Sequence, residues 1–146
     1  MNIKASRKIH FCAGHRVHGH ESKCSNLHGH NYVLWVYASA SELDQLGRVI
    51  DFSVLKEKVD TWIQLHWDHT FLAYEKDSEL LALEPQIEKK KPWFICPFNP
   101  TAENMASYLL KKIIPELLEG TGVTVSRLVL YETENCMVEV KASILL

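Results

Sequence analysis

"HNYVLWVYASA", residues 30–40, is apolar on both faces when it is drawn as an extended strand. Its alternating positions give one face Tyr32, Leu34 and Val36, and the other face Val33, Trp35 and Tyr37. A strand of this kind has to be covered on both sides. One layer of helices covers only one side of a sheet, so we expect another subunit to close the other side.

Three further stretches predict strands, and two predict helices. Apolar residues alternate before the quoted stretch and again near the C-terminus, whereas helical spacing follows Ser53 and Pro100. Ser53 is the expected N-cap of the first helix and Thr101 that of the second, which Pro115 should end or kink. The additional strands are expected at residues 3–13, 123–132 and 136–145, the last two joined by a tight turn in "ETENC".

The order of these elements is β-β-α-α-β-β, with a polar, proline-interrupted excursion between the helices at about residues 74–97. We expect that excursion to hold at most one short helix. Strands that come in pairs around helices are typical of α+β proteins. The sequence therefore predicts an antiparallel four-stranded sheet with two helices packed on one face.

Composition narrows the class of protein. The chain has 146 residues and a net charge of −2, which fits one domain and argues against binding to nucleic acid or to an anionic membrane. The N-terminal residues lack the apolar core of a signal peptide, and no apolar stretch approaches the roughly 20 residues that span a bilayer. Four scattered cysteines without a CxxC pair suggest reduced thiols, so we expect a cytoplasmic protein.

Eight histidines are the unusual feature of the composition, and three of them predict a metal site. His28 and His30 project from the same face of a strand, and antiparallel pairing brings His15, at the end of the first strand, beside them. Three imidazoles suit a zinc ion with an open fourth position. A lone histidine at a strand end is more often an ordinary surface or core residue, and the second HxH pair, His18 and His20, lies in a loop.

The cysteine closest to this group, Cys24, has two possible roles. It could be a fourth zinc ligand that closes a structural site, or a nucleophile or base activated by nearby positive charge. Spacing alone does not decide between these roles. The other three cysteines lie in apolar surroundings and are expected to be packing residues: Cys12, Cys96 and Cys136.

Four more polar residues are candidates for the site. Asp68 beside His69 could orient the imidazole and raise its basicity, although a helix C-terminus explains this histidine equally well. Glu132 is predicted on the apolar-facing side of its strand, where a carboxylate needs a partner such as a guanidine-like pair of N–H groups. Glu103, in the first turn of a helix, has an ordinary explanation in the helix dipole.

Six motifs, taken together, are similar to those of the 6-pyruvoyl tetrahydropterin synthase / 6-carboxytetrahydropterin synthase family. They occur in the family's order and approximate spacing, over nearly the whole chain apart from an apparent insertion at about residues 74–97. The motifs are "HFCAGH", "CSNLHGHNY", "GRVIDFSVLK", "WDHTFL", "NPTAEN" and "YETEN". The resemblance implies a T-fold whose subunits form a barrel around a central tunnel, commonly as homo-hexamers, with active sites between subunits.

The resemblance also implies roles for individual residues. His15, His28 and His30 match the zinc ligands, and Cys24 matches the catalytic thiol. Asp68 and His69 match its charge-relay partners, which a neighbouring subunit can supply. Glu132 matches the carboxylate that anchors the pterin and is sometimes counted with the relay, while Glu103 matches a second carboxylate near the pterin.

The implied substrate is 7,8-dihydroneopterin triphosphate, and the implied enzyme is a zinc-dependent lyase. Three residues separate Cys24 from the HGH motif, a short gap typical of the carboxy-forming branch, which serves queuosine biosynthesis. That branch yields 6-carboxy-5,6,7,8-tetrahydropterin and releases acetaldehyde and triphosphate. The pyruvoyl-forming activity, another pterin-transforming activity and a non-catalytic zinc-binding T-fold protein remain alternatives. A lysine run at 89–91 could contact the phosphates or could simply be solvated.

Overall fold

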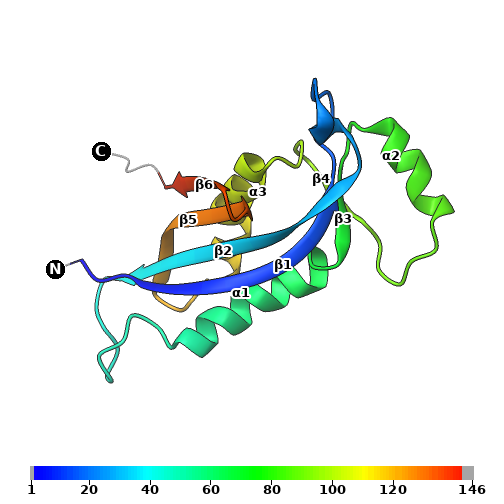
Figure 1. Ribbon diagram of the computed structural model, residues 1–146. Coiled ribbons are helices and arrows are strands. Elements are labelled where there is room, and N and C mark those ends of the chain that lie inside the picture. Colours follow the sequence, from blue (N-terminus) through cyan, green and yellow to red (C-terminus); the bar gives the residue numbers. More distant parts are fainter. Residues whose placement is uncertain (1, 143–146) are drawn as a thin grey trace.

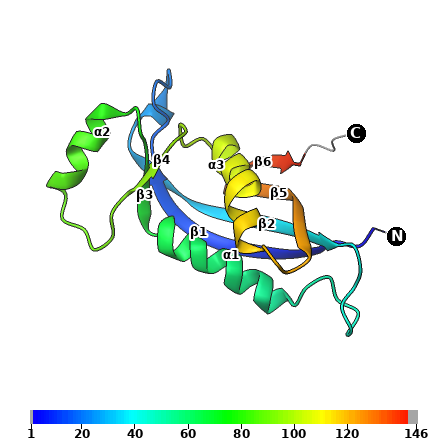
Figure 2. The same cartoon turned by 180° about the vertical axis from the view of Figure 1, so that it is seen from behind.

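A six-stranded sheet organises the chain in the computed structural model, which describes residues 2–142. The strand order is β4-β3-β1-β2-β5-β6, and α1 and α3 cover one face of the sheet (Figures 1 and 2). None of the described helices is long and apolar enough to cross a membrane. The strands are β1 Ala5–His15, β2 His28–Ala40, β3 Thr70–Tyr74, β4 Phe94–Cys96, β5 Val123–Thr133 and β6 Cys136–Lys141.

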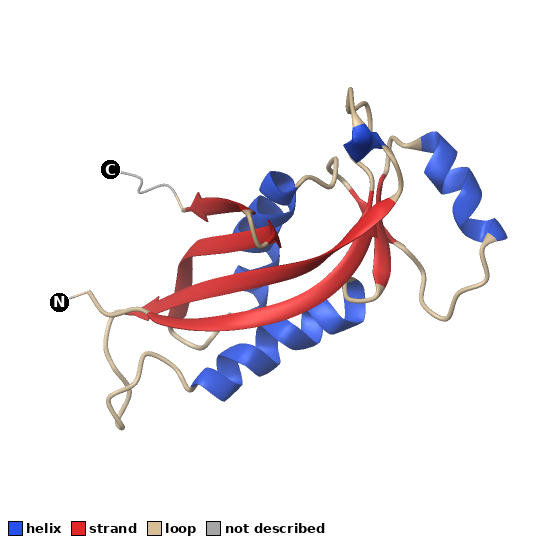
Figure 3. Ribbon diagram, in the orientation of Figure 1, coloured by secondary structure: helices blue, strands red, loops and turns tan. Residues whose placement is uncertain are grey.

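The long β1–β2 pair forms the centre of the sheet (Figure 3). It is antiparallel over the whole length of β1, from Ala5 opposite Ala38 to His15 opposite His28. β5 then pairs antiparallel with β2, and β6 with β5. The four strands predicted from alternation are thus confirmed, except that residues 143–145 of the last predicted strand lie outside the described residues.

The prediction of a purely antiparallel, four-stranded sheet is wrong at one edge. β3 pairs parallel with the end of β1, and β4 pairs parallel with β3. These strands have five and three residues, too few for alternation to be visible in the sequence. The segment predicted as an excursion is therefore a crossover between two parallel strands, with one short helix, α2 Ser78–Leu83, as expected.

The first helix, α1, spans Phe52–His66, and its N-cap is Asp51 rather than the predicted Ser53. The Asp51 carboxylate accepts hydrogen bonds from the backbone N–H and the hydroxyl of Ser53, at 2.8 and 2.6 Å. Asp and Ser both serve well as N-caps, and the carboxylate stands two residues earlier. The helix buries Leu55, Val59 and Ile63 against the sheet.

The second long helix begins as predicted at Thr101, whose hydroxyl accepts the N–H of Asn104 at 3.1 Å. It continues through three segments: α3 Ala102–Tyr108, a π-helical turn Leu109–Ile113, and α4 Ile114–Leu117. Pro115 has no N–H to bond back along a helix, and the wider π-helical turn ends at Ile113, two residues before it. The helix therefore ends at Leu117, two residues beyond the proline, rather than at it.

The two faces of the sheet differ in how they are covered. Tyr32, Leu34 and Val36 are buried under the helices together with Ile9 and Phe11 of β1. On the opposite face, the three remaining apolar side chains of the quoted stretch are only half-buried: Val33, Trp35 and Tyr37. This face has no covering layer within the described part of the chain, as the pattern of residues 30–40 predicts.

A buried ion pair attaches the crossover to the end of β1. The guanidinium of Arg16 makes two hydrogen bonds to the carboxylate of Asp77, at 2.6 and 2.7 Å, and Asp77 is 1% exposed. These hydrogen bonds hold the pKa of Asp77 below its usual range, so the carboxylate stays charged. Asp77 also caps α2, which fixes this helix next to the loop that follows β1.

Replacing Leu34 with alanine should destabilise the protein strongly, because this fully buried side chain lies between Ile9 and Leu130 of the neighbouring strands. We expect a loss of about 2–5 kcal/mol in the free energy of unfolding, measured by urea denaturation. Leu46→Ala is the matched control: its side chain is 77% exposed, and its effect should stay within about 0.5 kcal/mol. Equal effects of the two substitutions would contradict the assigned core.

Candidate functional site

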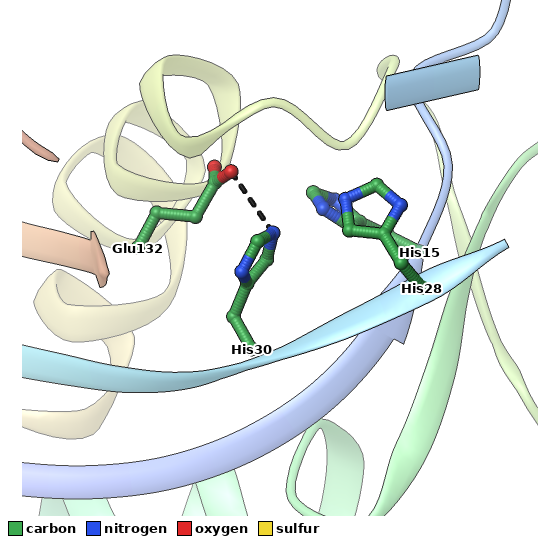
Figure 4. Close-up of side chains that lie close together, drawn as sticks. All are labelled: His15, His28, His30 and Glu132. Atoms are coloured by element: carbon green, nitrogen blue, oxygen red, sulfur yellow. Dashed lines mark ion pairs between the residues drawn. The ribbon is translucent and has the colours of Figure 1, made fainter. Parts of the chain in front are cut away.

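Three histidines meet where β1 ends and β2 begins. His15 lies directly opposite His28 in the antiparallel register, and Ala13 lies opposite His30, so all three side chains project from the same face. The ring centres are 4.6 Å apart for His15 and His28, 4.8 Å for His28 and His30, and 5.1 Å for His15 and His30. Figure 4 shows the three rings converging on one space.

Glu132 of β5 completes this group. Its carboxylate oxygen Oε1 lies 2.9 Å from Nε2 of His30 (Figure 4). One donor atom from each of the four residues lies within 4.8 Å of all the others. The contact with His30 confirms the prediction that Glu132 lies on the apolar-facing side of its strand, because His30 shares its face of β2 with the buried Tyr32 and Leu34.

Backbone carbonyls fix the orientation of two of the rings. Nδ1 of His15 donates to the carbonyl of Pro100 at 2.7 Å, and Nδ1 of His28 donates to the carbonyl of Asn26 at 2.7 Å. A proton held on Nδ1 leaves Nε2 with a free lone pair, the usual arrangement of a histidine that binds metal. The "NPTAEN" motif thus has a structural role: it caps α3 through Thr101 and presents the Pro100 carbonyl to His15.

The ring nitrogens aimed into the group lack partners. Among the described residues, the buried Nε2 of His15 has no partner, and the buried Nε2 of His30 makes no hydrogen bond and has only the Glu132 carboxylate, at 2.9 Å, beside it. Burial lowers the pKa of His15 to about 4, and it also lowers the pKa of His30 despite the nearby carboxylate. Neutral imidazoles with unpartnered nitrogens are what a metal ion requires, so these residues fit one.

A second group lies on the other face of the sheet. The Asp68 carboxylate is 2.7 Å from Nδ1 of His69, and the Cys12 thiol lies 3.5 Å from Nε2 of the same ring. Cys12 alternates with the inward-facing Phe11 and Ala13, so its side chain points away from the helices. Asp68 and His69 therefore do not reach the three histidines within one chain.

Two of the three cysteines predicted as packing residues are not. Cys12 is half-buried and contacts His69, and Cys136 is exposed at the start of β6. Cys12 stands between apolar residues, but strand alternation turns it outward, whereas Cys136 follows Asn135 at the exposed start of β6. Cys96 is buried as predicted, and burial raises the pKa of its thiol to about 12.

Other predicted residues stand apart from both groups. Cys24 lies half-buried in the 3-10 turn Lys23–Ser25, and neither it nor Glu103, which is exposed in the first turn of α3, belongs to a described metal-ligand group. His18 lies near the Asp77 carboxylate, at 3.6 Å, instead of near the other histidines. In the lysine run, Lys89 and Lys91 donate to backbone carbonyls of the same chain.

A sequence profile described as 6-pyruvoyl tetrahydropterin synthase matches residues 4–143. The chain belongs to the 6-pyruvoyl tetrahydropterin synthase family. A relative from Rickettsia felis named 6-carboxy-5,6,7,8-tetrahydropterin synthase is 44% identical over 138 residues, which cover 94% of this chain and 99% of the relative. A relative of the same name from Haemophilus influenzae is 34% identical over 144 residues, covering 94% and 97%.

Solved structures agree on the fold. An uncharacterized protein from Wolinella succinogenes superposes with a TM-score of 0.84 at 24% identity, covering 98% of this chain and 99% of the other. The 6-pyruvoyl tetrahydropterin synthase of Caenorhabditis elegans superposes with a TM-score of 0.69 at 23% identity, covering 98% and 97%. At these identities the likeness shows a shared fold, and it confirms the α+β fold of the 6-pyruvoyl tetrahydropterin synthase family for this chain.

His15→Ala should abolish tight metal binding, because a site built on three imidazoles has no spare ligand. The measurement is bound metal per chain after purification and dialysis, by atomic absorption. His18→Ala is the control, since His18 lies outside the group and should leave the metal content unchanged. Full occupancy in the His15→Ala protein would exclude His15 as a ligand.

The metal-free protein should lose stability as the pH falls from about 6.5 to about 4. His15 has a folded-state pKa of about 4 against an ordinary value of 6.5, so within this window the unfolded chain binds the extra proton and is favoured. The difference in free energy of unfolding between wild type and His15→Gln should therefore change with pH across this window. A difference that stays constant between pH 7 and pH 4 would contradict the assignment.

Proposed function

We propose that this protein is a 6-carboxy-5,6,7,8-tetrahydropterin synthase, a lyase that acts on 7,8-dihydroneopterin triphosphate. The observation that carries the proposal is a convergent His15–His28–His30 group in a chain whose relatives of that name match 94% of its length at 40–44% identity. The three residues between Cys24 and the HGH motif favour the same branch over the pyruvoyl-forming one.

Zinc is the proposed metal, held by His15, His28 and His30. When bound, it would act as a Lewis acid toward the hydroxyl oxygens of the substrate side chain. Burial lowers the pKa of His15 to about 4 and so keeps this ligand neutral, and the Pro100 and Asn26 carbonyls hold the rings of His15 and His28 in place. Glu132 lies close enough to be a fourth ligand. If Glu132 instead binds the pterin, the fourth position on the metal is open to substrate.

A cavity of about 630 Å³ beside this group is the proposed pterin site. Its lining includes His30 and Glu132, and also Trp35 and Tyr131, whose side chains stand on the open face of the sheet. A pterin is a flat ring system with an amidine-like N–H edge. The Glu132 carboxylate can accept two charge-assisted hydrogen bonds from that edge. Glu103 is proposed as a second carboxylate near the ring.

Proton transfer is assigned to Cys24 and to the Asp68–His69 pair. Cys24 would take or relay a proton of the substrate side chain, and Asp68 would hold His69 in the tautomer that exchanges protons with the thiol. Because Asp68 and His69 face away from the three histidines of their own chain, we infer that a second copy supplies them to each zinc site. A homo-oligomer, with a hexamer favoured, satisfies this requirement and also covers the half-buried face of β2.

Product analysis tests this proposal directly. The purified zinc-loaded protein, incubated with 7,8-dihydroneopterin triphosphate, should release triphosphate and acetaldehyde and form 6-carboxy-5,6,7,8-tetrahydropterin, identified by mass spectrometry. A product that retains the three-carbon side chain would assign the pyruvoyl-forming activity instead. Absence of any product from zinc-loaded protein would favour a non-catalytic zinc-binding protein.

Cys24→Ala should reduce turnover by at least about a hundredfold, the lower end of what positioned acid–base groups contribute, and leave zinc content unchanged. The reason is that Cys24 lies outside the described metal-ligand group. The paired measurements are product formation and zinc per chain, with the exposed Cys136→Ala as control for loss of a thiol. Loss of zinc together with the thiol would indicate a closed structural site.

Glu132→Gln should weaken pterin binding by about 2–3 kcal/mol, because the amide replaces a charged acceptor by a donor that faces the pterin N–H edge. Pterin affinity can be followed by fluorescence titration. Zinc content measured on the same sample separates the two roles of this carboxylate: unchanged zinc with weak pterin binding supports the anchor, whereas loss of zinc assigns Glu132 as a ligand. Unchanged pterin affinity would move the anchor elsewhere, with Glu103→Gln the next variant.

A further inference from the structure

The thiol of Cys12 is a reactive group that the proposed reaction does not use. Its side chain stands on the face of the sheet opposite the three histidine side chains, at the edge of an open cavity of about 290 Å³ that His30, His69 and Thr70 also line. One donor atom from each of Cys12, Asp68 and His69 lies within 4.8 Å of the others. Sulfur, carboxylate oxygen and imidazole nitrogen therefore converge at a second place on the chain.

Backbone hydrogen bonds build this group independently of any ligand. The N–H of His69 donates to the carbonyl of Cys12 at 2.7 Å, and the N–H of Cys12 donates to the Asp68 carboxylate at 2.9 Å. The ammonium group of Lys91 donates to the carbonyl of Asp68 at 2.6 Å. These bonds hold His69 in the left-handed region, with φ of 57°, a conformation that a non-glycine residue keeps only when its surroundings impose it.

The side-chain spacing suits coordination of a shared ion as well as a weak thiol–imidazole hydrogen bond. The Cys12 sulfur is 3.5 Å from Nε2 and 3.6 Å from Nδ1 of His69. Tetrahedral zinc bonds of the usual lengths separate sulfur from nitrogen by about 3.6 Å, and the His69 ring, 76% exposed, is free to turn one nitrogen toward a shared ion.

We propose that Cys12, Asp68 and His69 form a second metal site, which shares no ligand with the three-histidine site and is selective for a borderline divalent ion such as zinc or cobalt. A thiolate, an imidazole and a carboxylate suit such ions, whereas magnesium and calcium prefer oxygen ligands alone. The thiol gives up its proton to solvent on binding, and the two resulting negative charges balance the ion. The open cavity leaves room for water as the fourth ligand.

An ion bound here would occupy Asp68 and His69, the pair that the proposed function assigns to proton transfer together with Cys24. The second site would then restrain the reaction when the free ion is abundant. This consequence rests on the proposed function, whereas the existence of the site does not. Its test therefore measures binding alone.

The test is a cobalt titration of protein that already carries one zinc per chain at the three-histidine site. Zinc binds such ligands more tightly than cobalt does, so added cobalt should go to the second site. We expect one equivalent of cobalt to bind and to produce a thiolate-to-cobalt charge-transfer band in the near ultraviolet. Binding of no cobalt beyond the zinc, or binding without a thiolate band, would overturn the proposal.

Matched variants assign the ligands. Cys12→Ser should abolish the band, while Cys24→Ser and Cys136→Ser should keep it; a band that persists in Cys12→Ser, or that disappears in Cys24→Ser, would overturn the assignment. Retained zinc and an unchanged circular dichroism spectrum verify that each variant is folded. His69→Asn is a second variant that should also lose the band, and asparagine tolerates the left-handed backbone at this exposed position.

Discussion

The antiparallel register between β1 and β2 is the constraint on which the rest of the structure depends. It sets His15 opposite His28 and Ala13 opposite His30, so three imidazoles share one face. A slip of one residue would turn every side chain of one strand to the other face and would also expose its buried apolar positions. The energy that buries Ile9, Phe11, Tyr32 and Leu34 therefore also enforces the geometry of the metal group.

The same alternation divides the chemistry of the chain between two faces. The helix-covered face holds the three histidines and Glu132, and the open face holds Cys12, Asp68 and His69. No rotation of side chains within one chain brings the two sets together, because the sheet lies between them. In the proposed function, a relay that includes both sets is assembled between chains, and the half-buried open face of β2 is the surface offered to a neighbouring copy.

Much of this structure could be predicted from the sequence, because long elements carry many repeats of their period. β1, β2, β5, β6 and the two long helices were predictable for this reason, whereas β3 and β4 are too short to show one and depend on pairing with β1. The histidine group was predictable because an HxH pair and one strand end suffice to define it. The Pro100 carbonyl that orients His15 was not predictable, because every residue has a backbone carbonyl and the sequence does not show which one a side chain will contact.

Cys12 shows the opposite failure. Its neighbours Phe11 and Ala13 are apolar, but they point to the other face, and the group that Cys12 contacts comes from His69, 57 residues further along the chain. The apolar neighbours of Cys12 in the sequence therefore say nothing about the surroundings of its side chain. Prediction from sequence is weakest for contacts between distant segments on an open face. In this chain such contacts bring Cys12, Asp68 and His69 together.

Residues 16–27 connect β1 to β2. The positions of the two strand ends are set by strand pairing rather than by this connection. Residues can be gained or lost there at small entropic cost without moving His15 or His28. Cys24 lies inside this connection, so the reach of its thiol can change over evolutionary time while the metal ligands stay in place. The histidine group is therefore held by strand pairing, while the position of Cys24 depends on the length of the connection.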